Sequence, residues 1–328
     1  MPSRIAGACA LTAFLAVPLM APALAAAQTG PGGATSGWTP PRTPWGDPDL
    51  QGIFTNKDEN GTPMERPDEF EGRTLDEVRA ADLAKLVQER QEQHDARAPG
   101  LGGADTGAGP PHWFESFGAA NSQPWLVLDP PDGRIPPLTE EAEARRRRPA
   151  RPTRGFNDPA DSHADFGLYE RCITLGLPGS MTPMIYGNAY QIVQGPGFVG
   201  IRYEMVHETR IIPLDGAPHV GEAIRPYMGD ARGRWEGDTL VVETTNFKAG
   251  QRGSTDRLRL IERFTRIAPD KVYWEVTFED PATWTRPWTY GMPLTQDPGH
   301  QVFEYACHEG NHGLPNILSA SRADEAGK

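Results

Sequence analysis

Hydrophobic and polar residues alternate with a period of two along much of the second half of the chain. The clearest run covers residues 271–279, whose apolar face consists of Val272, Trp274, Val276 and Phe278. This alternation predicts a half-buried antiparallel strand. Residues 258–267 alternate in the same way, and Pro269 suits the second position of a type I turn between the two runs. Together the runs predict a β-hairpin.

Further strands are expected at residues 189–194, 198–206, 239–247 and 301–307. Short turns separate several of them, such as Glu236-Gly237-Asp238. Strands at this spacing indicate an antiparallel sheet rather than alternating strands and helices. The predicted fold is therefore mainly β, an antiparallel barrel or sandwich, with a lipocalin-like barrel as one form of it.

Residues 28–164 are rich in Pro, Gly and charge and contain few apolar runs, which predicts an irregular N-terminal wrap. One helix is expected at residues 75–94, where Thr74 and Glu77 have the spacing of a capping box. The expected organisation is a leader at residues 1–27, this N-terminal region, and an antiparallel β domain at residues 165–328.

The first 27 residues have the three parts of a cleavable signal peptide. Arg4 supplies the positive charge, residues 5–19 are apolar, and residues 23–27 offer small-residue cleavage sites. The apolar stretch is shorter than the roughly 20 residues of a membrane-spanning helix, and Pro18 and Pro22 interrupt it. We therefore expect a periplasmic or secreted mature protein without a membrane span.

The chain has three cysteines, and cleavage of the leader would remove Cys9. The remaining two, Cys172 and Cys307, are expected to form a disulfide because the periplasm and the exterior are oxidising. A free catalytic thiol is the alternative interpretation.

The formal net charge of −12 argues against nucleic acid and anionic membranes as partners, because both select basic patches. The basic run at residues 145–148 follows acidic residues 140–143, which is typical of a solvated helix with compensating charges. No nucleotide or flavin motif is present. We expect no cofactor and a small molecule as partner, and the sequence carries no signal for an oligomeric state.

A first group of candidate site residues follows the strand expected at residues 198–206. It comprises Glu204, His207, Arg210 and Asp215. Strand ends and the loops after them are where β scaffolds display functional groups. An ordinary strand edge with a salt-bridged arginine and an exposed histidine is an equally weighted alternative.

Glu262 is the second candidate, because alternation places it on the apolar face of its strand. A carboxylate there must be paired, or its pKa must rise as a general acid requires. Arg234 and Arg286 are candidate partners in a purely structural pair. Trp284 and Arg286 belong to an aromatic, turn-rich segment that suits sugar or phenolic ligands, although core packing is the commoner use of a tryptophan.

The third group is His308, Glu309 and Asn311, directly after Cys307. A disulfide from Cys307 would hold this polar loop rigid. With His312 the loop matches the H-E-x-x-H pattern of zinc peptidases, which requires a helix. Two glycines, Gly310 and Gly313, and a proline two residues later disfavour that helix, so no metal is expected.

Six segments carry a resemblance that spans most of the mature chain: WGDPDLQGIF, LDPPDGRIPPLT, GDARGRWEGDTLVVETTNF, LIERFTRI, DPATWTRPW and EYACHEGNHG. With them the chain resembles a family of exported, uncharacterised bacterial proteins. The resemblance implies export and assigns no catalytic residue. In that family the position of His312 is often aromatic, which implies that the zinc pattern is incidental here.

The leading hypothesis is a periplasmic enzyme that performs acid/base chemistry, by hydrolysis, elimination or isomerisation, on a small polar or aromatic natural product such as a glycoside. His207 and His308 would be acid/base groups in one shared pocket. Glu309 or Glu262 would be the carboxylate partner, and Arg210 would hold an anionic oxygen. A non-catalytic lipocalin-type binding protein is the alternative, and an envelope-structural protein without a pocket is the third possibility. Convergent His, Glu and Arg side chains would favour the enzyme.

Overall fold

The computed structural model describes residues 38–97, 115, 121–147, 160–248 and 251–327. All of them belong to one compact unit, Pro31–Lys328. The predicted signal peptide lies outside the described residues.

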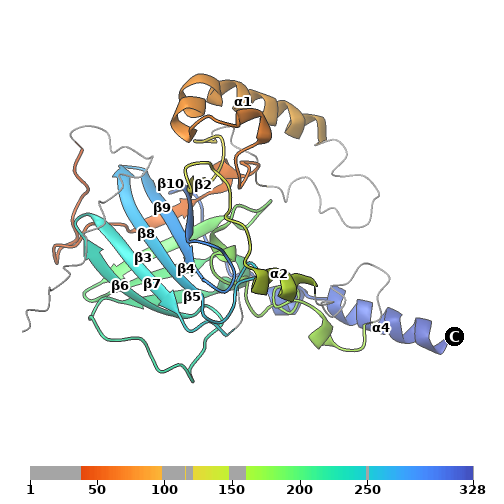
Figure 1. Cartoon of the computed structure of the whole chain (residues 1–328). Helices are drawn as coiled ribbons and strands as arrows, with labels where there is room; N and C mark the ends of the chain where they lie inside the picture. The colour runs from red at the N-terminus through yellow and green to blue at the C-terminus, as the bar shows by residue number, and fades with distance from the viewer. Residues whose placement is uncertain (1–37, 98–114, 116–120, 148–159, 249–250, 328) are drawn as a thin grey trace, which may run out of the picture. The chain divides into compact units, whose positions relative to one another are not determined.

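The described part of the chain is built around one antiparallel sheet that curves into a nearly closed barrel (Figure 1). Its order is β5-β4-β3-β1-β10-β9-β8-β7-β6, and β2 pairs separately with β10. The strands are β1 (Gly52–Thr55), β2 (Val127–Asp129), β3 (Ala189–Gly195), β4 (Phe198–Tyr203), β5 (Thr209–Pro213), β6 (Asp230–Glu236), β7 (Thr239–Thr245), β8 (Arg259–Ala268), β9 (Lys271–Glu279) and β10 (Trp288–Gln296). The prediction of a mainly β fold, an antiparallel barrel or sandwich, is confirmed, and the barrel is the form that the chain adopts.

The barrel closes by side-chain packing between its two edge strands, β5 and β6. A Cβ atom added to Gly233 of β6 would lie 2.7 Å from Ile212 of β5 and 2.6 Å from Leu214. Only a glycine therefore lets the two edges approach this closely. The inward face of β5 consequently looks across the interior at the strands on the far side of the sheet.

Alternation along the strands fills the interior with large side chains. In β9 the four apolar residues of the sequence pattern are completely buried, and the inward residues of β8 and β10 are buried against them. The largest buried side chains include Trp274, Trp288, Tyr190, Tyr203 and Tyr290. Fully buried aromatic side chains of this size supply much of the stabilisation of such a core.

Strand β10 has two partners on the edge that faces away from β9. β1 pairs with its last residues, Thr295 and Gln296, whereas β2 pairs with Thr289 and Tyr290 near its start. The backbone N–H of Gly291 donates to Leu126 on this edge, 3.1 Å away. Backbone N–H groups two residues apart in a strand point to the same edge, so the nitrogen of Pro293 faces this edge too, between β1 and β2. A proline is tolerated there because no ladder bond is lost.

The predicted hairpin is confirmed as β8 and β9, and β9 has the predicted bounds. The prediction of a strand at residues 301–307 is wrong. Residues 301–306 form no strand, the short helix Cys307–Gly310 follows them, and Phe303 is 68% exposed. The last strand of the sheet is instead β10. Strand β4 also ends earlier than predicted, at Tyr203, because Val206 adopts a φ of +59° within the turn that follows.

The α-helices are α1 (Leu75–Arg97), α2 (Glu140–Arg147), α3 (Cys307–Gly310) and α4 (Gly313–Ala326). Short 3-10 turns lie at Lys57–Glu59, Asp68–Phe70, His163–Asp165, Gly179–Met181 and Met205–His207. The predicted capping box of α1 is confirmed, since Thr74 and Glu77 exchange side-chain to backbone hydrogen bonds of 2.8 and 3.3 Å. Among the described residues no helix is long and apolar enough to span a bilayer.

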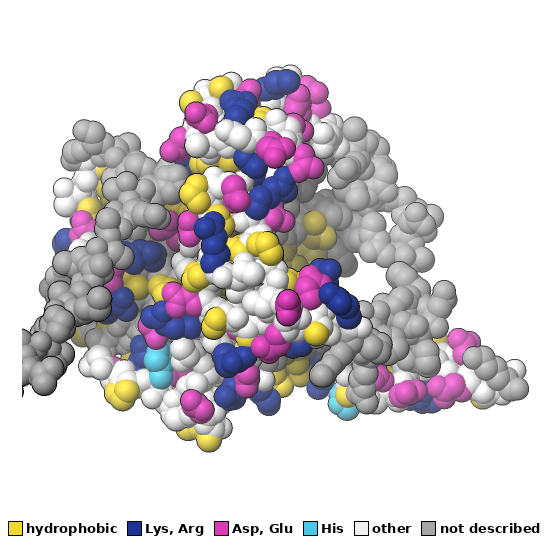
Figure 2. Space-filling view, in the orientation of Figure 1, with side chains coloured by type: hydrophobic (Ala, Val, Ile, Leu, Met, Phe, Trp, Pro, Cys, Tyr) yellow, Lys and Arg dark blue, Asp and Glu magenta, His cyan; other side chains and the backbone are white. Residues whose placement is uncertain are grey.

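Charges on the surface are mixed in sign. On the face shown in Figure 2, basic and acidic side chains lie next to one another rather than in separate patches. Helix α2 illustrates the pattern, because its arginines pair with glutamates one turn away, Arg145 with Glu141 and Arg146 with Glu143. The interpretation of this segment as a self-compensating helix is confirmed.

Candidate functional site

The two ends of the barrel differ in their connections. At one end, tight hairpins join β3 to β4, β6 to β7 and β8 to β9, each with two residues between the strands. At the other end the connections are longer and comprise residues 204–208, 246–258 and 280–287. We call these the hairpin end and the long-loop end. Long loops on a rigid barrel are the usual place for a binding site.

A buried ion pair crosses the interior near the long-loop end. Arg210, the second residue of β5, binds both carboxylate oxygens of Glu262 in β8, and its Nη2 atom lies 3.1 Å from Oε1. The two side chains are only 3% and 0% exposed. Trp274 in β9 donates its indole N–H to the same carboxylate at 3.2 Å. The pair therefore links opposite walls of the barrel.

The prediction that Glu262 faces the apolar interior is confirmed, but both partners suggested for it are wrong. Arg234 pairs with Glu236 in an exposed position, and Arg286 is exposed. Arg210 takes their place because closure of the barrel brings β5 opposite β8. Strand alternation alone cannot reveal that juxtaposition.

Burial alone would lower the pKa of Arg210, but the negative charge of Glu262 outweighs it and raises that pKa. Arg210 consequently remains charged at every physiological pH. Burial raises the pKa values of Tyr190, Tyr203 and Tyr290. Each of these tyrosines therefore keeps its proton and can both donate and accept a hydrogen bond.

These side chains form one group, which we call the interior cluster: Tyr190, Tyr203, Arg210, Glu262, Trp274 and Tyr290. The rings of Tyr190 and Tyr203 meet edge to face with centroids 6.0 Å apart, and those of Trp274 and Tyr290 do so at 5.5 Å. The charge of Arg210 acts on Tyr203, and the charge of Glu262 acts on both Tyr203 and Tyr290. Aromatic faces and charged groups are thus combined in one buried volume.

Arg252 covers this group at the long-loop end. Its guanidinium lies 5.6 Å from the ring centroid of Tyr290 and donates to Thr182 Oγ1 at 3.1 Å. Thr182 Oγ1 is in turn 3.3 Å from the Tyr290 hydroxyl. Arg252 is exposed and adopts a φ of +51°, which is unusual for a residue with a side chain. A cation at the surface therefore connects by hydrogen bonds to the buried tyrosine.

Several buried polar atoms near the long-loop end meet no well-aligned hydrogen-bond partner among the described residues. They come from separate elements, namely Asn56 Oδ1, Ser180 Oγ, Tyr203 OH, Arg210 Nε, Thr244 Oγ1 and Trp288 Nε1. Asn56 follows β1, Ser180 lies in a 3-10 turn, and the other four stand at strand ends on this side of the barrel. Native proteins leave few such groups unpaired, so their concentration here requires an explanation.

The interior near the hairpin end has a different character. It is lined mainly by aliphatic and phenylalanine side chains, including Ile192, Val199, Leu240, Phe264 and Leu294, all almost completely buried. The indole N–H of Trp235 is an unpartnered buried atom at this end. The polar groups of the barrel thus gather at the long-loop end.

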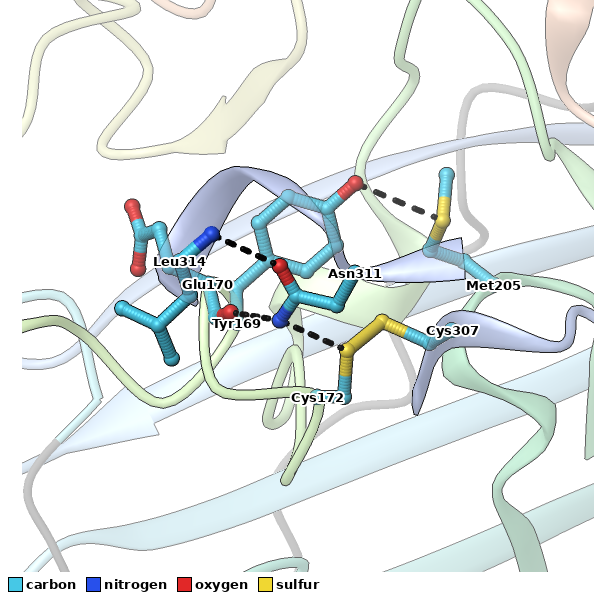
Figure 3. The surroundings of a disulfide bond; sticks show 7 residues. All are labelled: Tyr169, Glu170, Cys172, Met205, Cys307, Asn311 and Leu314. Carbon is cyan, nitrogen blue, oxygen red and sulfur yellow. Dashed lines mark hydrogen bonds between the residues drawn. A yellow bond between two sulfur atoms is a disulfide. The ribbon is translucent and has the colours of Figure 1, made fainter. Parts of the chain in front are cut away.

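The predicted disulfide between Cys172 and Cys307 is confirmed, with Cα atoms 5.7 Å apart (Figure 3). Asn311 reinforces the junction by donating to the carbonyl of Glu170 at 2.8 Å, and its own oxygen accepts from the backbone of Leu314 at 3.3 Å. Tyr169, three residues before Cys172, donates to the sulfur of Met205 at 3.6 Å. The candidate residue Asn311 therefore attaches helix α4 to the segment around the disulfide.

The other candidates of that loop lie on the surface. His308 and Glu309 are exposed, whereas Glu262 and Arg210 are buried, so these groups are not brought together. Helix α3 ends at Gly310 and α4 begins at Gly313, so His308 and His312 do not share one helix as a zinc peptidase requires. Nowhere in the described ranges do three His, Cys, Asp or Glu side chains cluster in a metal-binding arrangement.

The first candidate group is divided between the two ends of β5. Glu204 lies at the long-loop end and accepts from His300 Nε2 at 2.8 Å and from the Ala189 backbone at 3.3 Å. Asp215 lies beyond the opposite end of β5 and is exposed. The backbone of His207 belongs to the turn after β4, and its side chain is outside the described set. The shared pocket expected for His207 and His308 stays a prediction.

Trp284 is a core residue in this structure. It is 5% exposed and packs edge to face against Phe278 and Trp288, with centroids 5.4 and 5.6 Å away. Its neighbour Arg286 is exposed to solvent.

The sequence interpretation missed Tyr190, Tyr203 and Tyr290 as members of a polar cluster. Their inward positions could have been read from strand alternation, but their convergence could not.

Comparison of the chain with protein-family models, with curated proteins and with solved structures finds no match.

Proposed function

We propose that this protein binds a small polar molecule with aromatic character inside the long-loop end of the barrel. The observation that carries the proposal is that six of the twelve buried side-chain polar atoms without a well-aligned partner, among the described residues, lie at this end. Each such group costs about 1–3 kcal/mol when it is desolvated without a hydrogen bond. A ligand, or water that a ligand displaces, would supply the missing partners.

A purely structural role accounts less well for this arrangement. The Arg210–Glu262 pair satisfies most of its own hydrogen bonds, yet Arg210 Nε and the Tyr203 hydroxyl beside it interact with each other's residue without completing a well-aligned hydrogen bond. Apolar residues of similar size at a buried ion pair are often equally stable or more stable. The presence of this buried pair beside polar groups without well-aligned partners therefore favours recognition of a ligand over stabilisation.

The chemistry of these groups indicates the class of ligand. Arg210 Nε and Trp288 Nε1 can only donate, Asn56 Oδ1 can only accept, and the hydroxyls can do both. The aromatic rings of the interior cluster offer faces for a planar ring or for the apolar face of a sugar. Phenolic compounds and glycosides combine these features, in keeping with the class expected from the sequence.

The test compares two tyrosine variants by native mass spectrometry of protein purified from the periplasm. Wild type is expected to retain a small molecule. Tyr203→Phe removes a hydroxyl that makes no well-aligned hydrogen bond, so it should weaken retention about tenfold without lowering the melting temperature. Tyr273→Phe is the control, because its hydroxyl is bonded to Gln123 at 3.2 Å outside the cluster, and it should retain the molecule. Equal retention by both variants, or none by wild type under gentle conditions, would refute the proposal.

Acid/base catalysis on the bound molecule is the second candidate function. The observation that favours it is the contact between Glu204 and His300 at the long-loop end, since a carboxylate that orients an imidazole is a common arrangement of acid/base catalysts. Loss of turnover in His300→Gln with unchanged ligand retention would support catalysis. Retention without any turnover of the recovered ligand by wild type would leave the protein as a binder.

We propose further that the protein works in an oxidising compartment, as the predicted signal peptide and the resemblance to exported proteins indicate. The Cys172–Cys307 disulfide supports this location. Fractionation of cells that produce the full chain should place the protein in the periplasm or the medium.

A further inference from the structure

Arg66 is a buried arginine with which no carboxylate of the described residues forms an ion pair. It lies between the first two 3-10 turns, its residue is 8% exposed, and its backbone N–H donates to the carbonyl of Gly133 at 2.8 Å. The Nε atom is buried without a partner. Within the parts of the chain that the structure describes, no hydrogen bond or ion pair reaches this guanidinium. Arginine is rarely buried in this way unless an acceptor compensates its charge.

Trp125 places a second unpartnered donor beside Arg66. It is 1% exposed, and its Nε1 atom is buried without an acceptor. A Cβ atom added to Gly133 would lie 2.6 Å from this nitrogen and 2.8 Å from Cβ of Arg66. Gly133 has a φ of +69°, so both its conformation and its lack of a side chain permit this approach. Gly133 therefore packs against both the indole nitrogen of Trp125 and the first side-chain carbon of Arg66, which makes these two residues neighbours.

The neighbouring arginines are all provided with acceptors. Arg134, next to Gly133, pairs with Asp68, and Arg73 pairs with Asp82 at 2.7 Å. The partly buried Arg90 donates to Asn121 Oδ1 at 3.1 Å and to the carbonyl of Pro124 at 2.7 Å. Arg66 thus differs from the arginines around it in burial and in lack of partners. The burial of Arg66 is therefore not explained by the ion pairing that is common on this surface.

We infer that Arg66 and Trp125 form a second binding site, for an oxyanion such as a carboxylate or a phosphate group. The planar guanidinium matches the geometry of either group and is less strongly hydrated than an ammonium, so it binds anions well when partly buried. The indole N–H adds a neutral donor. The exposed fraction of Arg66 gives an anion access from the surface. This inference is independent of the barrel site.

Isothermal titration calorimetry of the folded, disulfide-bonded chain tests the site with inorganic phosphate and with acetate, against chloride at the same ionic strength. Wild type should bind one of the two oxyanions saturably, and the preferred one identifies the class of ligand. Arg66→Gln should weaken that binding at least tenfold. Arg134→Gln is the matched control, since it removes the adjacent, exposed guanidinium and should leave binding unchanged.

Trp125→Phe provides the second readout should Arg66→Gln fail to fold, because it removes only the indole N–H and keeps an aromatic ring against Phe70. It should weaken oxyanion binding several-fold and leave the preference between phosphate and acetate unchanged. Absence of saturable binding to wild type would overturn the inference. The inference would also be overturned if Arg66→Gln bound the oxyanion with wild-type affinity. If Arg66→Gln does not fold, wild-type affinity in Trp125→Phe would overturn it.

Discussion

Glu262 and Arg210 carry opposite charges in a place from which water is almost excluded. Each of the two would be costly alone, because desolvation of an unpaired charge costs several kcal/mol. Their bidentate contact and the indole N–H of Trp274 compensate that cost. Single and paired substitutions at these positions should therefore behave very differently.

Glu262→Gln should lower the free energy of unfolding by about 3–5 kcal/mol, since it leaves Arg210 charged and unpaired inside the barrel. The double variant Arg210→Met/Glu262→Met should be close to wild type in stability, because it replaces both charges with apolar groups of similar size. Urea denaturation measures both. A double variant as unstable as the single one would mean that the pair itself stabilises the fold.

At the scale of elements, Asp280 connects the loops of the long-loop end. It follows β9 and is 3% exposed. It accepts from the backbone of Thr255 at 2.6 Å, from the hydroxyl of Thr283 at 2.7 Å and from the backbone of Ala282 at 3.1 Å. Burial alone would raise the pKa of Asp280, but these hydrogen bonds outweigh burial and lower it. One carboxylate thus joins the β7–β8 and β9–β10 connections.

Asp280→Asn should cost about 1.5–3 kcal/mol at neutral pH, the range for hydrogen bonds to a charged group. Because the folded pKa lies below the unfolded value of about 3.9, this stabilisation is present above pH 4. The stabilisation is lost as the pH falls through the pKa of Asp280 in the folded protein. The free energy of unfolding of Asp280→Asn should therefore lack this part of the dependence on pH. Denaturation at several pH values measures it, with the exposed Asp132→Asn as control, expected within about 0.5 kcal/mol of wild type. Equal losses in both variants would contradict the assignment.

At the scale of the whole molecule, the disulfide joins positions 135 residues apart and connects the segment before β3 to the segment after β10. A cross-link over a loop of this length restricts the unfolded chain strongly. Asn311 and the Glu204–His300 contact attach the same C-terminal segment to the barrel.

Replacement of both cysteines, Cys172→Ala/Cys307→Ala, should lower the free energy of unfolding by up to about 4–5 kcal/mol, as the entropy of so long a loop implies. Chemical denaturation gives the value. Thiol titration of the unfolded, unreduced mature chain should detect no free cysteine. Two titratable thiols in that experiment would contradict the pairing.

The sequence by itself determined the character of the sheet and the inward position of Glu262. Both depend on the period of two, which is a local property of extended chain and is written directly in the order of residues. Residues 271–279 form β9 for this reason, and the disulfide followed from counting two cysteines. The same local pattern was misleading at residues 301–307, because the backbone of this segment does not pair with an edge of the sheet.

Only the tertiary structure decided which residues meet across the barrel. Arg210 reaches Glu262 because Gly233 lets the two edge strands pack together, and no local pattern encodes that approach over more than 50 residues. β10 is a strand despite Pro293 because its proline faces a gap between two partners that come from distant parts of the chain. Tertiary burial also separated His308 and Glu309 from the interior cluster, since a loop after the last strand packs wherever its disulfide and Asn311 hold it.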